Sequence, residues 1–357
     1  MDEGKKRGIM NLLVNELYRE DLSNIAQYID VDSDKSILVT GASGLIGSLI
    51  VDALLYYNEK NKNQHLVRVY AMARNKEKLE KRFQYWKGSL ELSLLSEDIC
   101  NPLPDELYFD FIFHAASNAD PGTYAVYPVE TIKTNVMGTI QVLEYARRHE
   151  GTRVLFTSTM EVYGEVPGKG VQEEQDYGLI NTNLIRSGYP ESKRVSELLC
   201  RSYVDEYGLD VVITRLGYIY GPTMTVADNK VVAQFIRNGL KSENIVLKSK
   251  GMQRRSYCYA ADAVAGMFCV LFSGEKGEVY NIANKDSVVT IAEMAQIVAD
   301  IVGTEVVYSV PDSIEIKGSS DPQDAVLSTE KLETLHWKPH LDMHNGLKRT
   351  LMILGKD

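Results

Sequence analysis

Hydrophobic residues along the chain gather in short apolar runs that alternate with longer amphipathic segments. The strand-like runs cover residues 37–40, 66–72, 111–116, 153–158, 210–215 and 278–283. Segments with helical spacing lie between most of them, at 44–57, 75–83, 123–149 and 189–207. Strands separated by helices of this length predict an α/β fold, in which one parallel sheet is covered by helices on both faces.

The two ends of the chain depart from this alternation. Near the N-terminus, one or two short amphipathic helices are predicted from the spacing of Leu12, Leu13, Leu17, Leu22, Ile25 and Ile29. We expect them to pack on the main body or on a partner subunit. After residue 215 the pattern loosens, with a helix expected at 231–240 and two or three more after 290. This predicts a smaller, discontinuous second domain at the carboxyl edge of the sheet, where open α/β sheets bind ligands.

Composition and charge narrow the classes of function. The chain has 357 residues, of which 44% are hydrophobic and 25% charged, as in ordinary soluble proteins. The longest apolar stretch, at 263–272, is shorter than the ~20 residues of a membrane helix, and residues 1–8 do not resemble a signal peptide. We therefore expect a cytoplasmic protein with no membrane partner. The formal net charge of −10 argues against nucleic acid, although local arginines can still bind a small anion.

The four cysteines are Cys100, Cys200, Cys258 and Cys269, and their spacing is unlike that of metal ligands. We expect reduced thiols and no metal site.

A glycine loop follows the first predicted strand. In ILVTGASGLIG, Gly41, Gly44 and Gly47 stand directly between a strand and a helix. Glycines there allow a tight turn and let backbone N–H groups approach a pyrophosphate at the helix N-terminus. The loop predicts binding of a dinucleotide.

Two further positions concern the rest of that dinucleotide. The second strand ends without an acidic residue, and Arg74 stands where an acid would contact the ribose of NAD. An arginine there can pair with the 2′-phosphate of NADP, so this residue alone favours NADP. Asp98, in the segment SEDICNPL (96–103), is placed to contact the adenine amine.

A tyrosine and a lysine four residues apart, Tyr189 and Lys193, share one face of a predicted helix. A phenol is a poor base at neutral pH, but a neighbouring ammonium and a positive nicotinamide ring would lower the pKa of Tyr189. The phenolate could then remove a proton from a substrate hydroxyl while hydride leaves the same carbon.

Five motifs stand in a characteristic order: TGASGLIG, HAAS (114–117), NVMGT (135–139), STMEVYG (158–164) and YPESK (189–193). In this order the chain, from residue 36 to about 350, resembles the extended short-chain dehydrogenase/reductases, which include nucleotide-sugar epimerases, dehydratases and decarboxylases. Residues 1–35 precede this region as an N-terminal extension. The resemblance implies a Rossmann domain (36–216 and 257–283) and a nucleotide-sugar-binding domain (217–256 and 284–357). It also implies NAD or NADP as cofactor, and a homodimer built on a four-helix bundle from helices within 123–149 and 189–207.

The same resemblance implies residue roles. Tyr189 is the general base, Lys193 its partner and a ligand of the nicotinamide ribose, Thr159 the hydrogen-bonding partner of the reacting hydroxyl, and Asn135 a structural residue. The implied cofactor site comprises Gly41, Ser43, Gly44, Leu45, Ile46, Gly47, Arg74, Asp98, Ile99, Ala115, Ala116, Ser117, Asn135, Tyr189 and Lys193. The implied substrate site comprises Thr159, Met160, Tyr218, Val231 and Arg255.

Position 160 separates members of the family. The similar 4,6-dehydratases have an acid there, and the thioether of Met160 has no proton to donate. Glu161 occupies the place of a glutamate in UDP-glucuronate decarboxylases, which makes it a fourth catalytic candidate. On an extended segment the two neighbouring side chains would point to opposite faces.

Three later segments, 220–236, 253–264 and 321–339, also resemble the decarboxylases. Arg255 falls on an arginine that meets a diphosphate or carboxylate, anions that its guanidinium can bind through two hydrogen bonds. The chain departs from the decarboxylase pattern at Tyr218, Thr223, Asp324 and Ala325.

Three hypotheses follow. The first is a 4-epimerase or UDP-glucuronate decarboxylase that oxidises the sugar at C4 with a retained cofactor. In this scheme the 4-keto group permits loss of CO2 from C5, or return of hydride to the other face. The second is an NAD(P)H-dependent reductase of a nucleotide-linked keto-sugar, which Arg74 and the altered substrate segments favour. The third is a dinucleotide-binding scaffold without activity, and the presence of Thr159, Tyr189 and Lys193 argues against it.

Overall fold

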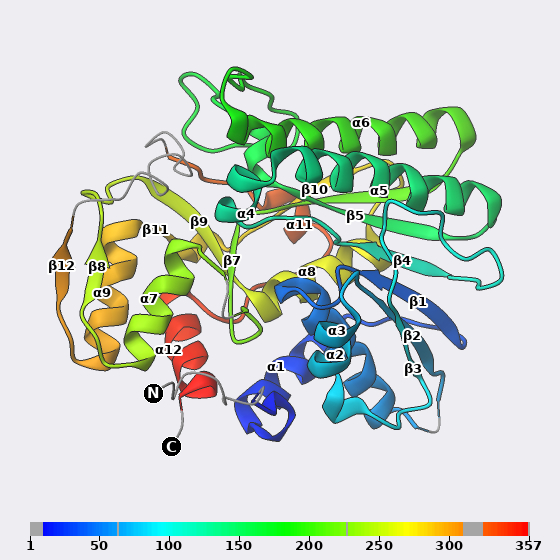
Figure 1. The fold of residues 1–357 in the computed structure, drawn as a ribbon, viewed down its shortest axis with the longest axis horizontal. Helices are drawn as coiled ribbons and strands as arrows, with labels where there is room; N and C mark the ends of the chain where they lie inside the picture. Colours follow the sequence, from blue (N-terminus) through cyan, green and yellow to red (C-terminus); the bar gives the residue numbers. More distant parts are fainter. Residues whose placement is uncertain (1–9, 63, 226–227, 310–323, 356–357) are drawn as a thin grey trace.

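The central feature of the computed structural model is a seven-stranded parallel sheet (Figure 1). The structure describes residues 10–62, 64–225, 228–309 and 324–355. Across the sheet, the strands follow the order β10 (Val279–Ile282), β6 (Asp210–Leu216), β5 (Arg153–Thr159), β4 (Phe111–His114), β1 (Lys35–Thr40), β2 (Val67–Met72) and β3 (Leu92–Leu95). The predicted α/β fold with a Rossmann-type parallel sheet is confirmed.

The strand order places a crevice at the carboxyl end of β1. The first strand pairs with β2 on one side and β4 on the other, so that Thr40 lies opposite both Met72 and His114. From β1 the strands continue to β2 and β3 on one side and to β4, β5, β6 and β10 on the other. The strand order therefore reverses at β1. Ligands of open α/β sheets bind at such a point.

Helices cover both faces of this sheet, as the sequence predicts. On one face lie α2 (Leu45–Lys60) and α8 (Ala260–Ser273), with α1 (Glu16–Ala26) packed on both. On the other lie α5 (Pro128–Arg148) and α6 (Gly188–Tyr207), which pack along each other (Figure 1). The short helices α3 (Lys76–Arg82), η3 (Gln84–Trp86) and α4 (Pro121–Val126) connect these elements. The predicted helix 123–149 is therefore two helices, divided at Tyr127, because Pro128 starts a new helix at its N1 position.

The most apolar stretch of the sequence forms helix α8, and residues 260–271 are all buried. Its neighbours explain this burial, because α8 contacts the sheet strands β5 and β6 on one side and the helices α1 and α2 on another. A helix that is apolar all round belongs inside the protein core. No helix in the described part of the chain combines the length and apolarity that crossing a membrane requires.

The remaining elements lie beside one end of the sheet, at the left in Figure 1. A three-stranded sheet is formed by β11 (Val288–Thr290), β9 (Arg254–Tyr259) and β7 (Tyr218–Tyr220), and a two-stranded one by β12 (Val306–Tyr308) and β8 (Ile245–Leu247). The helices here are α7 (Val231–Leu240), α9 (Ile291–Val302) and α12 (Met343–Leu354), with η6 (Lys285–Ser287). Helix α11 (Glu330–Glu333) instead contacts β10 of the large sheet. The exact domain boundaries stay a prediction.

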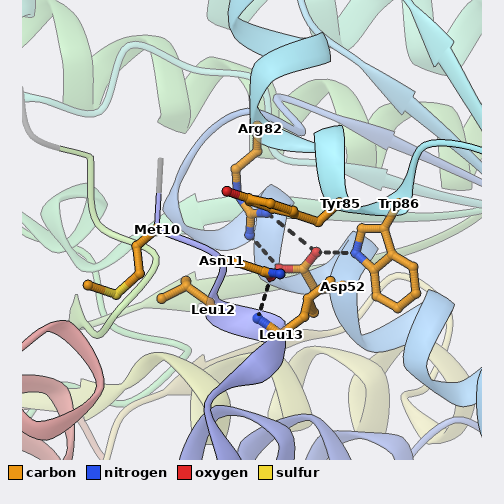
Figure 2. Close-up of a pocket in the computed structure, with 8 residues that line it drawn as sticks. All are labelled: Met10, Asn11, Leu12, Leu13, Asp52, Arg82, Tyr85 and Trp86. Atoms are coloured by element: carbon orange, nitrogen blue, oxygen red, sulfur yellow. Dashed lines mark hydrogen bonds and ion pairs between the residues drawn. The ribbon is translucent and has the colours of Figure 1, made fainter. Parts of the chain in front are cut away.

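The N-terminal extension packs on the main body, one of the two places expected for it. It forms η2 (Leu12–Val14) and α1, capped by Asn11 and Asn15. Asp52 of α2 is fully buried beneath it and accepts hydrogen bonds from the Tyr18 hydroxyl (2.6 Å) and the Trp86 indole (2.8 Å). Arg82 completes this cluster as the ion-pair partner of Asp52 (Figure 2).

One turn further along α1, Asp21 contacts the other end of the molecule. Its carboxylate accepts a hydrogen bond from the Tyr259 hydroxyl (2.6 Å) and lies 2.7 Å from Nε of Arg349 in α12. Helix α1 therefore joins the region around the large sheet to the C-terminal helix.

Candidate active site

The glycine loop forms a tight cradle at the N-terminus of α2. Gly41 has a φ of +67°, and a Cβ there would lie 2.7 Å from the carbonyl oxygen of Ala115. A Cβ on Gly47 would lie 2.5 Å from the carbonyl oxygen of Gly41, so neither position accepts a larger residue. Gly44 is the N-cap of α2 and has no side chain to occupy the helix N-terminus. This geometry suits an approaching phosphate.

The loop after β4 lies against this cradle. The Thr40 hydroxyl accepts hydrogen bonds from the backbone N–H groups of Ala115 and Ala116, both at 3.1 Å. Ser117 Oγ and Asn135 Oδ1 are buried, and within the described residues neither has a hydrogen-bond partner. Buried polar atoms without partners are costly, so a bound polar group is a physical reason for their presence. The residues fit a dinucleotide between β1 and β4.

The residues predicted to contact the ribose and the adenine of the cofactor have partners within the protein. Arg74 pairs with Glu130 of α5, and both side chains are about half exposed. The Asp98 carboxylate accepts a hydrogen bond from the backbone N–H of Cys100 (2.9 Å). Ile99 is buried against Gly138 of α5, and a Cβ on Gly138 would lie 3.0 Å from the Ile99 side chain. Ser43, Leu45 and Ile46 stand at the start of α2, as the motif predicts.

Tyr189 and Lys193 lie one turn apart on α6, and both are buried. The Lys193 ammonium donates a hydrogen bond to the Thr157 carbonyl of β5 (2.8 Å) and lies 4.8 Å from the centre of the Phe156 ring. Burial lowers the pKa of Lys193 to about 8, because desolvation disfavours the charged ammonium. Asn135 supports this helix, since its amide donates to Ser192 Oγ at 2.8 Å.

Three contributions from the chain itself act on the pKa of Tyr189. Burial raises it above the usual phenol value, the negative charge of Glu161 raises it further, and a hydrogen bond with Thr159 lowers it. The lowered pKa predicted for Tyr189 refers to a site with a positive nicotinamide ring beside the phenol, and it stays a prediction. Burial, which the sequence reasoning left out, is the largest contribution within the chain itself.

Glu161 lies among charged and aromatic groups from three other elements. It belongs to the 3-10 helix η4 (Met160–Tyr163), and its carboxylate accepts a hydrogen bond from Arg186 Nη2 at 3.0 Å. Arg186, in η5 (Ile185–Ser187), also lies 3.4 Å from the hydroxyl of Tyr124 in α4. The Tyr124 ring stacks on the ring of Tyr189, with centroids 4.9 Å apart. The site thus combines a buried phenol, an ion pair and an aromatic stack.

The segment carrying Glu161 is not extended, so the expectation based on an extended chain is wrong. Residues 160–163 form a helical turn instead. Arg194 of α6 holds this turn, because its guanidinium donates to the carbonyls of Val162 (2.6 Å) and Tyr163 (3.2 Å). Gly164 closes the turn with a φ of +61°. Met160 is buried in a small apolar cluster that also includes Tyr163 and Leu327.

Arg255 of β9 lies in the region of Glu161. It is buried, its guanidinium lies 4.6 Å from the centre of the Tyr218 ring, and the charge of Glu161 acts on it. Thus Arg255, Tyr218 and Glu161 come from distant parts of the chain to one region. Val231 begins α7 and is 40% exposed. Its loop contacts α4, because the Asn229 N–H donates to Asp120 (3.0 Å).

The residues that depart from the decarboxylase pattern have structural partners. The Thr223 hydroxyl donates to the Leu45 carbonyl (2.9 Å), which ties the loop after β7 to the start of α2. Asp324 pairs with Arg254 at 2.8 Å, and Ala325 forms a β-bridge with Arg255. Residues 226–227 and 321–323 of the resembling segments lie outside the described residues.

Sequence reasoning missed Tyr124, Arg186 and Arg194. Arg186 and Arg194 flank Tyr189 in IRSGYPESKR, and this proximity was the only available signal. Within the described residues, no group of three or more His, Cys, Asp or Glu side chains is arranged to hold a metal ion.

Comparisons with known proteins agree with this geometry. The model of the NAD dependent epimerase/dehydratase family matches residues 37–283. UDP-glucuronic acid decarboxylase 6 of Arabidopsis thaliana is 36% identical over 320 residues, which cover 88% of this chain and 87% of that protein. The dTDP-glucose 4,6-dehydratase of Streptomyces venezuelae, solved with NAD bound, is 28% identical with a TM-score of 0.74, covering 89% of this chain and 96% of that one.

A further solved structure shares the fold. UDP-glucuronic acid 4-epimerase from Bacillus cereus, in complex with UDP-glucuronic acid and NAD, has a TM-score of 0.75 at 24% identity. The match covers 89% of this chain and 98% of the epimerase.

Proposed function

The chain belongs to the NAD-dependent epimerase/dehydratase family, and we propose that within it the protein is a UDP-glucuronate decarboxylase. The observation that carries this proposal is Glu161, held by Arg186 beside Tyr189 and within the field of Arg255. The similarity to a UDP-glucuronic acid decarboxylase over most of both chains supports the same choice.

The first step of the proposed reaction needs a base at the sugar 4-hydroxyl. Tyr189 takes this proton, and Thr159 hydrogen-bonds the same hydroxyl. The glycine loop at Gly41, Gly44 and Gly47 would hold NAD+, which would supply an acceptor for the C4 hydride and a positive charge near the phenol. Burial raises the pKa of Tyr189. Lys193, one turn further along α6, is a second cation when protonated, and the two positive charges would oppose this effect of burial.

Oxidation at C4 prepares the loss of CO2. The carboxylate on C5 is then β to a ketone, so the C5–carboxyl bond breaks and its electron pair passes to the C4 oxygen as an enolate. Arg255 binds the anionic substrate at its diphosphate or carboxylate. The carboxylate of Glu161 lies next to C5, where CO2 is lost. A proton from solvent would then add to C5, and hydride supplied by the bound cofactor would return to C4, so that the products are CO2 and a UDP-linked pentose with no net oxidation.

The surroundings of position 160 argue against a 4,6-dehydratase. Loss of water from C5 and C6 needs an acid near the 6-hydroxyl, and Met160 has no proton to donate. Met160 instead packs with apolar neighbours.

The Arg74–Glu130 pair favours NAD over NADP. The Glu130 carboxylate already engages the guanidinium, and it would repel a 2′-phosphate placed beside it. This is the observation that weighs against an NADPH-dependent reductase.

The protein acts as a cytoplasmic homodimer in this proposal. Exposed apolar residues gather on α5 and α6, namely Val129, Ile132, Met137, Val195 and Leu198. A second copy would cover them in a four-helix bundle. The four cysteines are free, as expected in a reducing compartment.

A panel of UDP-, GDP-, CDP- and dTDP-sugars, incubated without added cofactor, tests the proposed activity by mass spectrometry. We expect UDP-glucuronate alone to lose the mass of CO2. Tyr189→Phe is the matched control, expected to bind cofactor but to lose about 10²–10⁴-fold in turnover. An unchanged mass with a new retention time would make the protein an epimerase. A gain of two hydrogens would make it a reductase.

A further inference from the structure

Arg186 lies between two groups that serve different steps of the proposed reaction. Its Nη2 is 3.0 Å from Glu161 Oε2 and 3.4 Å from the Tyr124 hydroxyl. Tyr124 in turn stacks on Tyr189, with 12° between the ring planes. One guanidinium therefore contacts both the carboxylate that acts at C5 and the ring that packs on the base for C4.

The surroundings restrict the position of this guanidinium. The Arg186 side chain is 18% exposed and that of Glu161 is 25% exposed. The Arg186 guanidinium carbon lies 5.9 Å from the centre of the Tyr124 ring. The attraction within a partly buried ion pair is stronger than within an exposed surface pair, because solvent and salt screen it less.

The geometry points to Arg186 as a positioning residue that holds the Glu161 carboxylate toward C5 of the bound sugar. This inference rests on the proposed function, because only a decarboxylase needs Glu161 at C5. The groups that face Glu161 are Arg186 of η5, Tyr124 of α4, Tyr189 of α6 and Arg255 of β9. Among them, Arg186 makes the ion pair.

Removal of this cation has two separate consequences. The Glu161 carboxylate can rotate away from C5, which slows loss of CO2. Its charge also acts on Tyr189 without compensation, which disfavours the phenolate and raises the pKa of Tyr189. A residue that only stabilised the fold would alter neither the reaction step nor the titration selectively.

The test compares Arg186→Gln, Arg186→Lys and Arg201→Gln, each with cofactor bound. Arg201 is an exposed arginine of α6, so its substitution controls for loss of charge on the same helix. The first measurement is CO2 release from UDP-glucuronate. The second titrates Tyr189 without substrate, as the phenolate absorbance of each variant minus that of its Tyr189→Phe counterpart.

We expect Arg186→Gln to slow CO2 release by roughly 10- to 100-fold, the loss of one charge-assisted hydrogen bond, and to move the Tyr189 titration to higher pH. Arg186→Lys should restore the titration, because the charge returns, but only part of the rate. Arg201→Gln should change neither. The inference is overturned if Arg186→Gln leaves both measurements as in the wild type, or if Arg201→Gln moves them equally.

The two proposals fail in distinguishable ways. If the wild-type protein releases no CO2 from UDP-glucuronate, the proposed function fails. The titration without substrate still tests whether Arg186 offsets the effect of the Glu161 charge on the pKa of Tyr189. An unchanged titration in Arg186→Gln would contradict the inference in that case also.

Discussion

The Tyr124 and Tyr189 rings are stacked, with centroids 4.9 Å apart and planes 12° from parallel. Tyr124 belongs to α4 and Tyr189 to α6, and both are buried. The stack fixes the orientation of the predicted base, which the helix backbone alone would leave free to rotate about its side-chain bonds.

This relationship predicts that Tyr124→Leu lowers turnover by up to about tenfold, because a stacked aromatic pair contributes about 0.5–1.5 kcal/mol. Tyr124→Phe keeps the stack and should retain most of the activity. Steady-state turnover of the two variants, with cofactor content as a control, measures the difference. Equal losses in both would assign the effect to the Tyr124 hydroxyl rather than to the ring.

A second prediction concerns Glu161→Gln. Burial and the negative charge of Glu161 both raise the pKa of Tyr189, so a neutral glutamine should lower it. Formation of reduced nicotinamide on mixing with UDP-glucuronate should then persist to lower pH than in the wild type. Release of CO2 should stop, so that reduced cofactor accumulates. A decarboxylation rate near that of the wild type would remove Glu161 from the reaction.

A third prediction concerns stability and Asp21. Burial raises the pKa of Asp21 to about 7, although Tyr259 and Arg349 act in the opposite direction. Because the folded-state pKa lies above the unfolded one, the stabilisation is present at low pH and is lost between about pH 4 and pH 7.

We therefore expect wild-type stability to fall relative to Asp21→Asn over that range, by at most about 1.4 kcal/mol for each pH unit. Urea unfolding of both proteins at several pH values measures it. A wild type that instead gains stability over the variant as the pH rises would show that the Arg349 ion pair outweighs burial.

A fourth prediction addresses the cofactor. Arg74→Ala should weaken the binding of NADP by about tenfold, because it leaves the Glu130 charge without its cation beside the 2′-phosphate, and it should leave the binding of NAD unchanged. Glu130→Gln frees the guanidinium and should tighten NADP. Binding constants for both cofactors measure these effects, with the exposed Arg68→Ala as control. Equal changes for NAD and NADP would place Arg74 outside the site.

Local patterns predicted much of this molecule. The apolar runs located the strands of the large sheet other than β3, whose partly exposed residues alternate too weakly to form such a run. The glycine motif predicted the turn at Gly41, because only a residue without Cβ fits beside Ala115. The four-residue spacing placed Tyr189 and Lys193 on one face of α6.

Contacts between distant segments could not be predicted in this way. The stack of Tyr124 on Tyr189 and the pair of Glu161 with Arg186 depend on how α4, η4 and η5 pack together. The raised pKa of Tyr189 follows from burial, which is a property of the folded chain. The turn at 160–163 depends in part on Arg194, which holds its carbonyls from another element.

Retention of the C4 hydrogen is the most direct test of the central claim, that the sugar is oxidised and reduced again at the same carbon. UDP-glucuronate with deuterium at C4 is incubated with the purified protein and no added cofactor. The account predicts a UDP-pentose that keeps the deuterium at C4, together with one CO2 for each molecule of product. A product that lacks the label, or that forms only when external NADH or NADPH is supplied, would contradict it.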